Sequence, residues 1–358
     1  MPPVTLDEIR AKIDGIDSEL LRLLNERADL VHAVGEIKKA QGLEIFAPER
    51  EVKLVESLLK RNRECGGRLP GSAIRAIYRE IMSAAKALEQ HLRIAYLGPP
   101  GTWAHQAALN KFGASVECVP QLSPADVFDQ VERRRADYGV VPIENSSEGA
   151  SSQTLDLFAE SPLKICAQIQ IPVENCLISR VERPQIAKIY SHPAVFAQCR
   201  DWLRRAFPHA EKIEASSTTR AAELAAADPA GAALAGALAA ELHGMAVLEQ
   251  SVQDSATNTT RFLVLSHKSA PPTGNDRTSL MFSIHDRPGA LFKALEPFNQ
   301  LHINMSKIES RPARRKDWAY FFFVDVMGHT EDAAVQNAIA GLEGHTAFLK
   351  VLGSYPNE

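Results

Sequence analysis

Residues 5–40 carry the pattern that most restricts how this chain can fold. Apolar side chains recur there at steps of three and four, the spacing of one face of an α-helix. Thr5 and Glu8 have the spacing of a capping box at the start, and Gly42 follows the end. The apolar positions are Ile9, Ile13, Ile16, Leu20, Leu23, Leu24, Val31, Val34 and Ile37.

A helix of this length extends about 50 Å at 1.5 Å per residue. Two shorter helices are predicted at about 48–62 and 72–92, separated by the loop sequence CGGRLPG. A lone bundle made from residues 1–92 cannot cover so long a helix. The pattern therefore predicts that a partner chain packs along it.

The rest of the chain has two other patterns. From Arg93, predicted strands alternate with helical stretches, which favours a parallel or mixed sheet with helices on its faces. The strands are expected at 93–98, 136–143, 163–171, 175–180, 187–191 and 261–266, and the helices at 105–112, 195–207 and 219–227. After linker-like residues 266–277, the order βαββαβ indicates a ferredoxin-like α+β fold.

Composition narrows the class of protein. The 358 residues are 45% apolar and 23% charged with a net charge of −4, which fits two or three folded domains. It suggests no nucleic-acid or membrane-surface binder. The five cysteines show no CxxC spacing, so we expect no metal site and no cofactor. No apolar leader is visible, the alanine-rich run 221–242 is too weakly apolar to span a bilayer, and a cytoplasmic location is expected.

Three cations of the first predicted helix have informative spacing. Arg27 and Lys38 share a face about 16 Å apart, so both side chains can lean toward one small anion. Arg10 lies about 26 Å from Arg27 along the axis and roughly 100° around it. Within one chain it cannot reach the same ligand, so a functional Arg10 would serve the site of a partner. Taken singly, each cation is also explained as a solvated surface charge.

Together with four other motifs, these residues resemble the all-helical chorismate mutase domain. The matching pieces are Ile9-Arg10, Asn25-Glu26-Arg27, Gly35-Glu36-Ile37-Lys38, Pro48-Glu49-Arg50-Glu51 and Glu80-Ile81-Met82-Ser83. The resemblance implies a pericyclic rearrangement of chorismate to prephenate, driven by conformational restriction and charge stabilisation. By it, Arg27 and the partner's Arg10 would hold the two carboxylates, with Arg50 supporting. Lys38 would donate to the ether oxygen and Glu51 would accept from the ring hydroxyl.

Three positions depart from the family pattern. An acidic residue is common where this chain has Ala47, and a serine where it has Ala85. Glu89 stands where some members have a glutamine that hydrogen-bonds the ether oxygen. A carboxylate there would repel the developing negative charge, whereas a protonated Glu89 would donate to it. We therefore expect Glu89 to be catalytic in its protonated form.

Five polar loops lie beside the predicted strands of the central region. They are 98–106, 144–149, 191–196, 216–220 and 257–262. Single loops of this kind are usually caps or turns, but several at sheet edges indicate a crevice lined with neutral donors. Such a crevice suits a small carboxylate, and the glycine-rich turn at 98–106 can present backbone N–H groups to an anion.

The motifs GPPGT, VVPIENSSEG, YSHP, SSTTRAAE and NTTRF resemble prephenate dehydratase across residues 93–267. The resemblance implies a two-lobed, periplasmic-binding-protein-like α/β fold and loss of water and CO₂ from prephenate to give phenylpyruvate. Thr260 would be the essential hydroxyl and Arg261 a carboxylate partner. Glu144 is either the acid or a structural carboxylate. Further candidate binders are Thr102, Asn145, Ser146, Ser191, His192 and Thr218. The family often has hydroxyl or amide side chains at Ala104 and Ala194.

The sequences HDRPGALFKAL and IESRP resemble the ACT regulatory domain, over residues 278–355. Pro288 suits the first turn of a helix whose N-terminal N–H groups a ligand can approach. The resemblance implies phenylalanine as effector, bound between two ACT domains and inhibiting the dehydratase. The candidate contributors are Gly289, Ala290, Leu291, Asn304, Glu309, Ser310 and Arg311.

The leading interpretation is a homodimeric bifunctional chorismate mutase–prephenate dehydratase with domains at 1–92, 93–267 and 278–355. One alternative is a monofunctional dehydratase, using prephenate or arogenate, whose helical domain only dimerises or senses a ligand. Another is a non-enzymatic sensor that binds a carboxylate in the central cleft without reaction.

Overall fold

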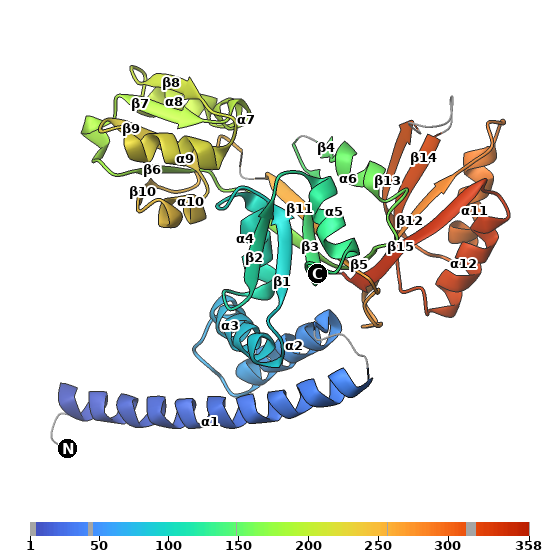
Figure 1. The fold of residues 1–358 in the computed structure, drawn as a ribbon, viewed down its shortest axis with the longest axis horizontal. Coiled ribbons are helices and arrows are strands. Elements are labelled where there is room, and N and C mark those ends of the chain that lie inside the picture. Colours follow the sequence, from blue (N-terminus) through green and yellow to red (C-terminus); the bar gives the residue numbers. More distant parts are fainter. Residues whose placement is uncertain (1–4, 42–45, 148, 256, 313–319, 358) are drawn as a thin grey trace.

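The computed structural model describes residues 5–41, 46–147, 149–255, 257–312 and 320–357. Gly42, expected to close the first helix, lies outside the described residues, as does Glu148 of the 144–149 loop. Figure 1 shows a helical unit built around the long first helix, two α/β lobes, and a C-terminal sheet covered by helices.

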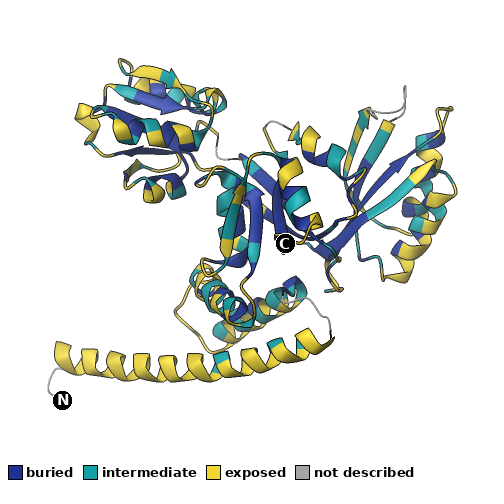
Figure 2. Ribbon diagram, in the orientation of Figure 1, coloured by how far each residue is buried: buried dark blue, intermediate teal, exposed yellow. Residues whose placement is uncertain are grey.

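The first helix, α1 (Leu6–Gln41), is unbroken and begins at the predicted capping box. The Glu8 backbone N–H donates to Thr5 Oγ1 at 3.3 Å, and the Thr5 N–H donates to Glu8 Oε2 at 2.9 Å. No residue of α1 is buried, and Figure 2 shows it exposed along almost its whole length. Ile16 is 60% exposed and Leu20 51%, so a single chain leaves the apolar face of α1 uncovered.

Two shorter helices complete this unit: α3 (Gly71–Glu89) packs against α1, and α2 (Pro48–Glu64) packs against α3. The helix predicted to reach residue 92 ends at Glu89, because the first strand begins at Arg93. Gly35 of α1 permits a close approach: a Cβ there would lie 3.0 Å from Cγ of Glu89. On its other side α3 is fixed to the α/β region, where Glu80 accepts from the Ala114 N–H at 3.0 Å.

The first lobe is a mixed sheet in the order β2-β1-β3-β11-β5, with β4 paired to β3. Strands β1, β2 and β3 are parallel, whereas β11 runs antiparallel to both β3 and β5. The strands are β1 (Arg93–Leu97), β2 (Glu117–Gln121), β3 (Tyr138–Asn145), β4 (Gly149–Ala150), β5 (Lys164–Pro172) and β11 (Thr259–Ser266). The helices are α4 (Trp103–Phe112), α5 (Pro124–Glu132) and α6 (Ser152–Leu157).

The second lobe is inserted between β5 and β11, and its sheet has the order β10-β6-β9-β7-β8. The strands are β6 (Cys176–Ser179), β7 (Lys188–Ser191), β8 (Glu211–Glu214), β9 (Gly231–Ala235) and β10 (Ala246–Glu249). The helices are α7 (Pro193–Gln198), α8 (Arg200–Ala206), α9 (Thr218–Ala227) and α10 (Ala237–Leu242), with a short 3₁₀ turn η1 at Arg183–Gln185. The chain crosses between the lobes twice, so the expected two-lobed α/β architecture is confirmed.

The predicted βαββαβ order of the C-terminal region is also confirmed. Its sheet is antiparallel in the order β13-β14-β12-β15. The strands are β12 (Asp276–Ser283), β13 (Met305–Pro312), β14 (Tyr320–Met327) and β15 (Phe348–Pro356), and the helices α11 (Ala290–Gln300) and α12 (Ala333–Glu343). Those helices cover one face of the sheet, where Phe282 and Val324 are buried. The other face packs on the first lobe through Met281 and Tyr355.

Two further facts bear on function. The contact between β15 and β5 is tight, because a Cβ at Gly353 would lie 2.2 Å from the Ile165 carbonyl oxygen. Among the described helices, none is long and apolar enough to cross a membrane.

Candidate active sites and regulatory region

Three of the predicted mutase residues meet where α1 crosses α3. The Lys38 ammonium lies 3.9 Å from Oε2 of Glu89, and the Glu89 side chain is only 8% exposed. Burial raises the pKa of Glu89, and the nearby charges of Lys38, Lys86 and Arg27 offset this only in part. Oε2 of Glu89 is buried with no hydrogen-bond partner among the described residues. A carboxyl in this position favours its protonated form more than an exposed glutamate does.

Glu51 points toward a cation that the sequence analysis did not anticipate. Lys86 of α3 is buried and its ammonium donates to Glu51 Oε1 at 2.9 Å. The same ammonium lies 5.3 Å from the ring centre of Phe46 and 5.5 Å from that of Phe112. Lys86 lies three residues after buried Ser83, on the same face of α3, and this spacing is the signal that could have found it.

Two predicted mutase residues stand away from this cluster. The Arg10 side chain is 66% exposed and lies 3.7 Å from Asp7 on its own helix. Because α1 is unbroken, the separation of about 26 Å between Arg10 and Arg27 holds in the folded chain. Arg50 is exposed at the start of α2. The residues that one chain brings together are therefore Arg27, Lys38 and Glu89, with Glu51 nearby on Lys86.

In the first lobe, the loops 144–149 and 257–262 are joined by hydrogen bonds. Asn145 donates from Nδ2 to Thr260 Oγ1 at 2.7 Å and to Asn258 Oδ1 at 2.8 Å. Ser146 Oγ donates to the Thr257 carbonyl at 3.1 Å and accepts from the Thr259 N–H at 2.9 Å. Thr260 is 8% exposed and lies where β11 begins, directly after the chain returns from the second lobe. The predicted hydroxyl therefore stands at the junction of the lobes.

Arg261 and Glu144 do not join Thr260 at this junction. Their side chains pair with each other at 2.9 Å, and Arg261 also contacts Asp325 at 2.7 Å and the Tyr355 hydroxyl at 2.8 Å. Neighbouring residues of a strand point to opposite faces, so Arg261 turns toward the C-terminal sheet while Thr260 turns away. In this structure the side chains of Arg261 and Glu144 therefore pair with each other and with the ACT domain rather than with Thr260.

Glu144 is also poorly suited to donate a proton. Burial alone would raise its pKa, but hydrogen bonds and charge from Lys307 and Arg261 outweigh this and hold the pKa below its ordinary value. The carboxyl is therefore ionised near neutral pH. In this structure its carboxylate joins two domains, through ion pairs with Arg261 and Lys307.

Three other predicted binders use their side chains in local structure. Thr102 is the N-cap of α4, accepting from the His105 N–H at 3.4 Å and donating to the Leu97 carbonyl at 3.0 Å. Ser191 is buried and donates to the Leu234 carbonyl at 2.8 Å. His192 caps α7, with Nδ1 accepting from the Ala194 N–H at 3.3 Å. Thr218, the fourth, is the half-buried first residue of α9.

Thr219, which the sequence analysis did not select, lies closer than Thr218 to the contact between the two lobes. Its Oγ1 is buried with no hydrogen-bond partner among the described residues, and the residue is 7% exposed. A Cβ at Gly101 would lie 3.4 Å from this hydroxyl, so the glycine-rich turn of the first lobe contacts α9 of the second. Gly101 has φ +86°, which favours glycine. The signal in the sequence was the second threonine of SSTTR.

Comparison with known proteins agrees with these three regions. Residues 9–90 match the chorismate mutase type II family, residues 94–270 the prephenate dehydratase family, and residues 278–344 the ACT domain family. A bifunctional chorismate mutase/prephenate dehydratase of Aquifex aeolicus (strain VF5) is 48% identical over 353 residues, 98% of each chain. This chain belongs to the bifunctional chorismate mutase/prephenate dehydratase family.

Two further relatives support this assignment. The bifunctional chorismate mutase/prephenate dehydratase of Neisseria gonorrhoeae (strain ATCC 700825 / FA 1090) is 42% identical, again over 98% of each chain. A solved prephenate dehydratase from Arthrobacter aurescens, in complex with L-Phe, superposes with a TM-score of 0.69 at 34% identity, covering 74% of this chain and 90% of that one. The bifunctional enzyme thus has both activities in phenylalanine biosynthesis, and the alternatives with one activity or none are not supported.

The ACT residues of the bifunctional enzyme fall at two ends of its C-terminal sheet. Gly289, with φ +76°, is the N-cap of α11, which begins at Ala290. Pro288 therefore lies before the helix begins. The sequence analysis had placed it in the first turn, and that expectation was wrong. Ser310 and Phe282 both pair with Phe322, so the end of β13 lies at the same end of the sheet as α11 begins.

Asn304 is exposed just before β13 begins, at the opposite end of that strand. Six residues of strand separate it from Ser310 by about 20 Å. Arg311 has a partner in another domain, because its Nε lies 3.4 Å from Oδ1 of Asp156 in α6. One chain therefore places the start of α11 and Ser310 at one end of the sheet and Asn304 at the other, while Glu309 lines the cavity beside the dehydratase domain.

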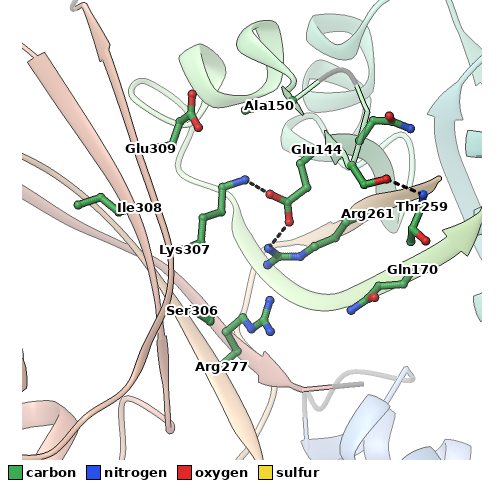
Figure 3. Close-up of a pocket in the computed structure, with 13 residues that line it drawn as sticks. Glu144, Ala150, Gln170, Thr259, Arg261, Arg277, Ser306, Lys307, Ile308 and Glu309 are labelled. Carbon is green, nitrogen blue, oxygen red and sulfur yellow. Dashed lines mark hydrogen bonds and ion pairs between the residues drawn. The ribbon is translucent and has the colours of Figure 1, made fainter. Parts of the chain in front are cut away.

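A cavity of about 550 Å³ lies between the dehydratase and ACT domains. Figure 3 shows Glu144, Arg261, Arg277 and Lys307 around it, with Glu309 at its rim. Thr260 is not among its lining residues, but Asn145, which donates to the Thr260 hydroxyl, lines it together with Ser146 and Thr259.

Proposed function

We propose that the mutase site of the bifunctional enzyme is shared between two copies of the chain. Arg27 of one copy and Arg10 of the other hold the two carboxylates of chorismate, supported by Arg50. Lys38 and protonated Glu89 donate to the ether oxygen as negative charge develops on it. Glu51, oriented by Lys86, accepts from the ring hydroxyl.

The observation that carries this proposal is the exposed, unbroken α1. Within one chain it holds Arg10 about 26 Å from Arg27, while its apolar face is covered by nothing that the structure describes. A second α1 packed along this face would bury those side chains and bring a second Arg10 toward the cluster of Arg27, Lys38 and Glu89. The proposal is therefore a homodimer with two equivalent mutase sites.

Mixed dimers test the shared site. Arg10→Ala and Arg27→Ala variants, each inactive as a mutase by itself, are co-refolded in equal amounts and assayed with chorismate. Each mixed dimer has one intact site, so random pairing should restore about a quarter of wild-type activity. No restoration from subunits that are shown to have exchanged would refute the shared site.

We propose that the dehydratase site is the junction of the two lobes, with Thr260 at its centre. Thr260 Oγ1 accepts a hydrogen bond from Asn145. The hydroxyl proton of Thr260 is therefore directed to another acceptor. In the site that acceptor is the departing hydroxyl of prephenate, while loss of CO₂ and aromatisation of the ring drive the reaction. Thr219 is a second neutral hydroxyl at the contact between the lobes.

The regulatory part of the proposal follows the same geometry. Asn304 lies at the other end of β13 from Gly289 and Ser310, so an antiparallel pair of ACT domains brings the two groups together. We propose phenylalanine as the ligand there, its carboxylate at the N-terminus of α11. The proposed domain limits are 1–92, 93–267 and 278–355, and the proposed location is the cytoplasm.

A further inference from the structure

Two adjacent cross-strand residue pairs between β3 and β11 of the first lobe have different side-chain interactions. Thr260 of β11 pairs with Asn145 of β3, and the next residue, Arg261, pairs with Glu144. The first pair is joined by the hydrogen bond of 2.7 Å from Asn145 to Thr260. The second is joined by the ion pair of 2.9 Å, which Figure 3 shows. One short piece of backbone thus links the proposed dehydratase hydroxyl to a buried arginine on the opposite face.

Three strands of the ACT sheet contribute side chains that contact the Arg261–Glu144 pair, and the fourth supports one of those side chains. Lys307 of β13 forms an ion pair with Glu144. Asp325 of β14 accepts from Arg261 Nη1 at 2.7 Å, and Tyr355 of β15 accepts from Nη2 at 2.8 Å. Ser279 of β12 donates to the other Asp325 oxygen at 2.5 Å. We call Lys307, Asp325, Tyr355 and Ser279 the ACT clamp.

Arg261 and three members of the ACT clamp are buried, and Lys307 is partly buried, which makes their charges strongly coupled. Arg261 and Asp325 are each 5% exposed, and Tyr355 is fully buried. Removing one partner of a buried ion pair leaves the other charge without compensation in a poorly solvated place. The Arg261 guanidinium is therefore held in one position by groups that belong to the ACT domain.

We propose that Asp325, in the ACT domain, is a positioning residue for the dehydratase reaction. Asp325 holds Arg261 in place. Through the two adjacent residue pairs of β3 and β11, it thereby keeps Thr260 and Asn145 in the geometry that the reaction needs. The inference rests on the proposed role of Thr260. It also supplies a physical path by which a shift of the ACT sheet changes the dehydratase site, since a residue moved by a fraction of an ångström can alter turnover strongly.

The test uses Asp325→Asn in the full-length enzyme, because asparagine keeps the shape and removes the charge. We expect dehydratase kcat to fall by roughly 10- to 100-fold with a smaller change in KM, the mark of lost positioning. The mutase kcat/KM, measured on the same preparation, should stay at the wild-type value. Tyr355→Phe, which removes one hydrogen bond to Arg261, should lower dehydratase kcat in the same direction but less.

Lys350→Met is the matched control. Lys350 also joins the ACT and dehydratase domains, donating to the carbonyls of Phe158 and Ser161 at 2.8 and 2.5 Å, but it does not touch the ACT clamp. It should leave dehydratase kcat near wild type. The proposal is overturned by unchanged kcat in Asp325→Asn, by an equal loss in Lys350→Met, or by a parallel loss of mutase activity.

A double variant separates this inference from the role of Thr260. In a Thr260→Ser background, Asp325→Asn should cost less turnover than in the wild-type background, because both changes act on one unit. Additive losses would overturn the positioning role while leaving Thr260 in place. Full dehydratase turnover in Thr260→Ala would instead remove the proposed function itself.

Discussion

The Lys38 ammonium and the Glu89 carboxyl lie 3.9 Å apart where α1 meets α3. Such a neighbour ordinarily lowers the pKa of a glutamate, yet burial is the larger effect and raises the pKa of Glu89. The contact at Gly35 maintains that burial, because it leaves no room for a side chain between the helices. The site therefore combines a lysine ammonium with a carboxyl that is protonated more readily than usual.

A pH-dependent mutase follows from the raised pKa. Protonated Glu89 donates to the ether oxygen, so mutase kcat/KM should be high below the folded-state pKa of Glu89 and fall as pH rises through it. Glu89→Gln should flatten this alkaline decline, since an amide donates at all pH values. The measurement is mutase kcat/KM across pH, with exposed Glu36→Gln as the control that keeps the wild-type profile. An unchanged alkaline decline in Glu89→Gln would show the assignment to be wrong.

Stability should follow the same titration. The folded state favours the protonated form of Glu89 more than the unfolded chain does, so this contribution is complete at low pH and is lost as pH rises through the raised pKa. Glu89→Gln should therefore gain in relative stability toward alkaline pH. Urea unfolding of both proteins at several pH values measures the difference, and a constant difference would contradict the raised pKa.

Thr260→Ala should lose dehydratase turnover by roughly 100-fold or more, within the range for removal of a positioned proton donor. Thr260→Ser keeps the hydroxyl and should retain part of the activity. Thr259→Ala, one residue earlier on the strand, is the control. Both activities are measured on each protein, and mutase activity should not change. A folded Thr260→Ala enzyme with full dehydratase turnover would exclude the proposed role.

Thr219→Val replaces a buried hydroxyl, for which the described part of the chain offers no hydrogen-bond partner, by a methyl group of similar size. If Thr219 contacts prephenate, KM should rise by about tenfold through the lost hydrogen bond, and Thr219→Ser should restore it. The free energy of unfolding should stay level or rise by about 1 kcal/mol, because a buried hydroxyl without a partner is costly. Unchanged steady-state kinetics in Thr219→Val would assign the hydroxyl no part in binding.

Ile16→Glu places a charge on the exposed apolar face of α1. It should produce monomers in analytical ultracentrifugation and abolish mutase activity, while dehydratase activity survives. Ser18→Glu adds the same charge about 200° around the helix and should leave the dimer intact. A monomeric wild-type protein with normal mutase turnover would contradict the shared site.

Sequence periodicity predicted the structure correctly where the pattern depended on residues close together in the chain. The 3.6-residue repeat of α1 and its capping box were readable because they depend on near neighbours. Strand β9, from Gly231 to Ala235, was missed because a short run of alanine has no strand preference of its own. It is a strand because all five of its residues are buried between β6 and β7.

The candidate sites show the same division. Thr260 and Arg261 were grouped by their motif, although alternation along a strand already separates neighbouring side chains. Which face meets substrate and which meets another domain is decided by distant partners, here Asp325 and Tyr355. Likewise, the residues around Glu51 in the sequence do not indicate that Lys86 is its partner, because α2 and α3 come into contact only in the folded chain.

By itself, the sequence determined the three domains, the long exposed helix, and the separation of Arg10 from Arg27, since these follow from local periodicity and motif spacing. Only the tertiary structure decided that Glu89 is buried beside Lys38, that Thr102 and Ser191 use their hydroxyls in local structure, and that Arg261 belongs to the ACT contact. The physical reason is that burial and pairing depend on segments far apart in the chain, which sequence spacing does not encode.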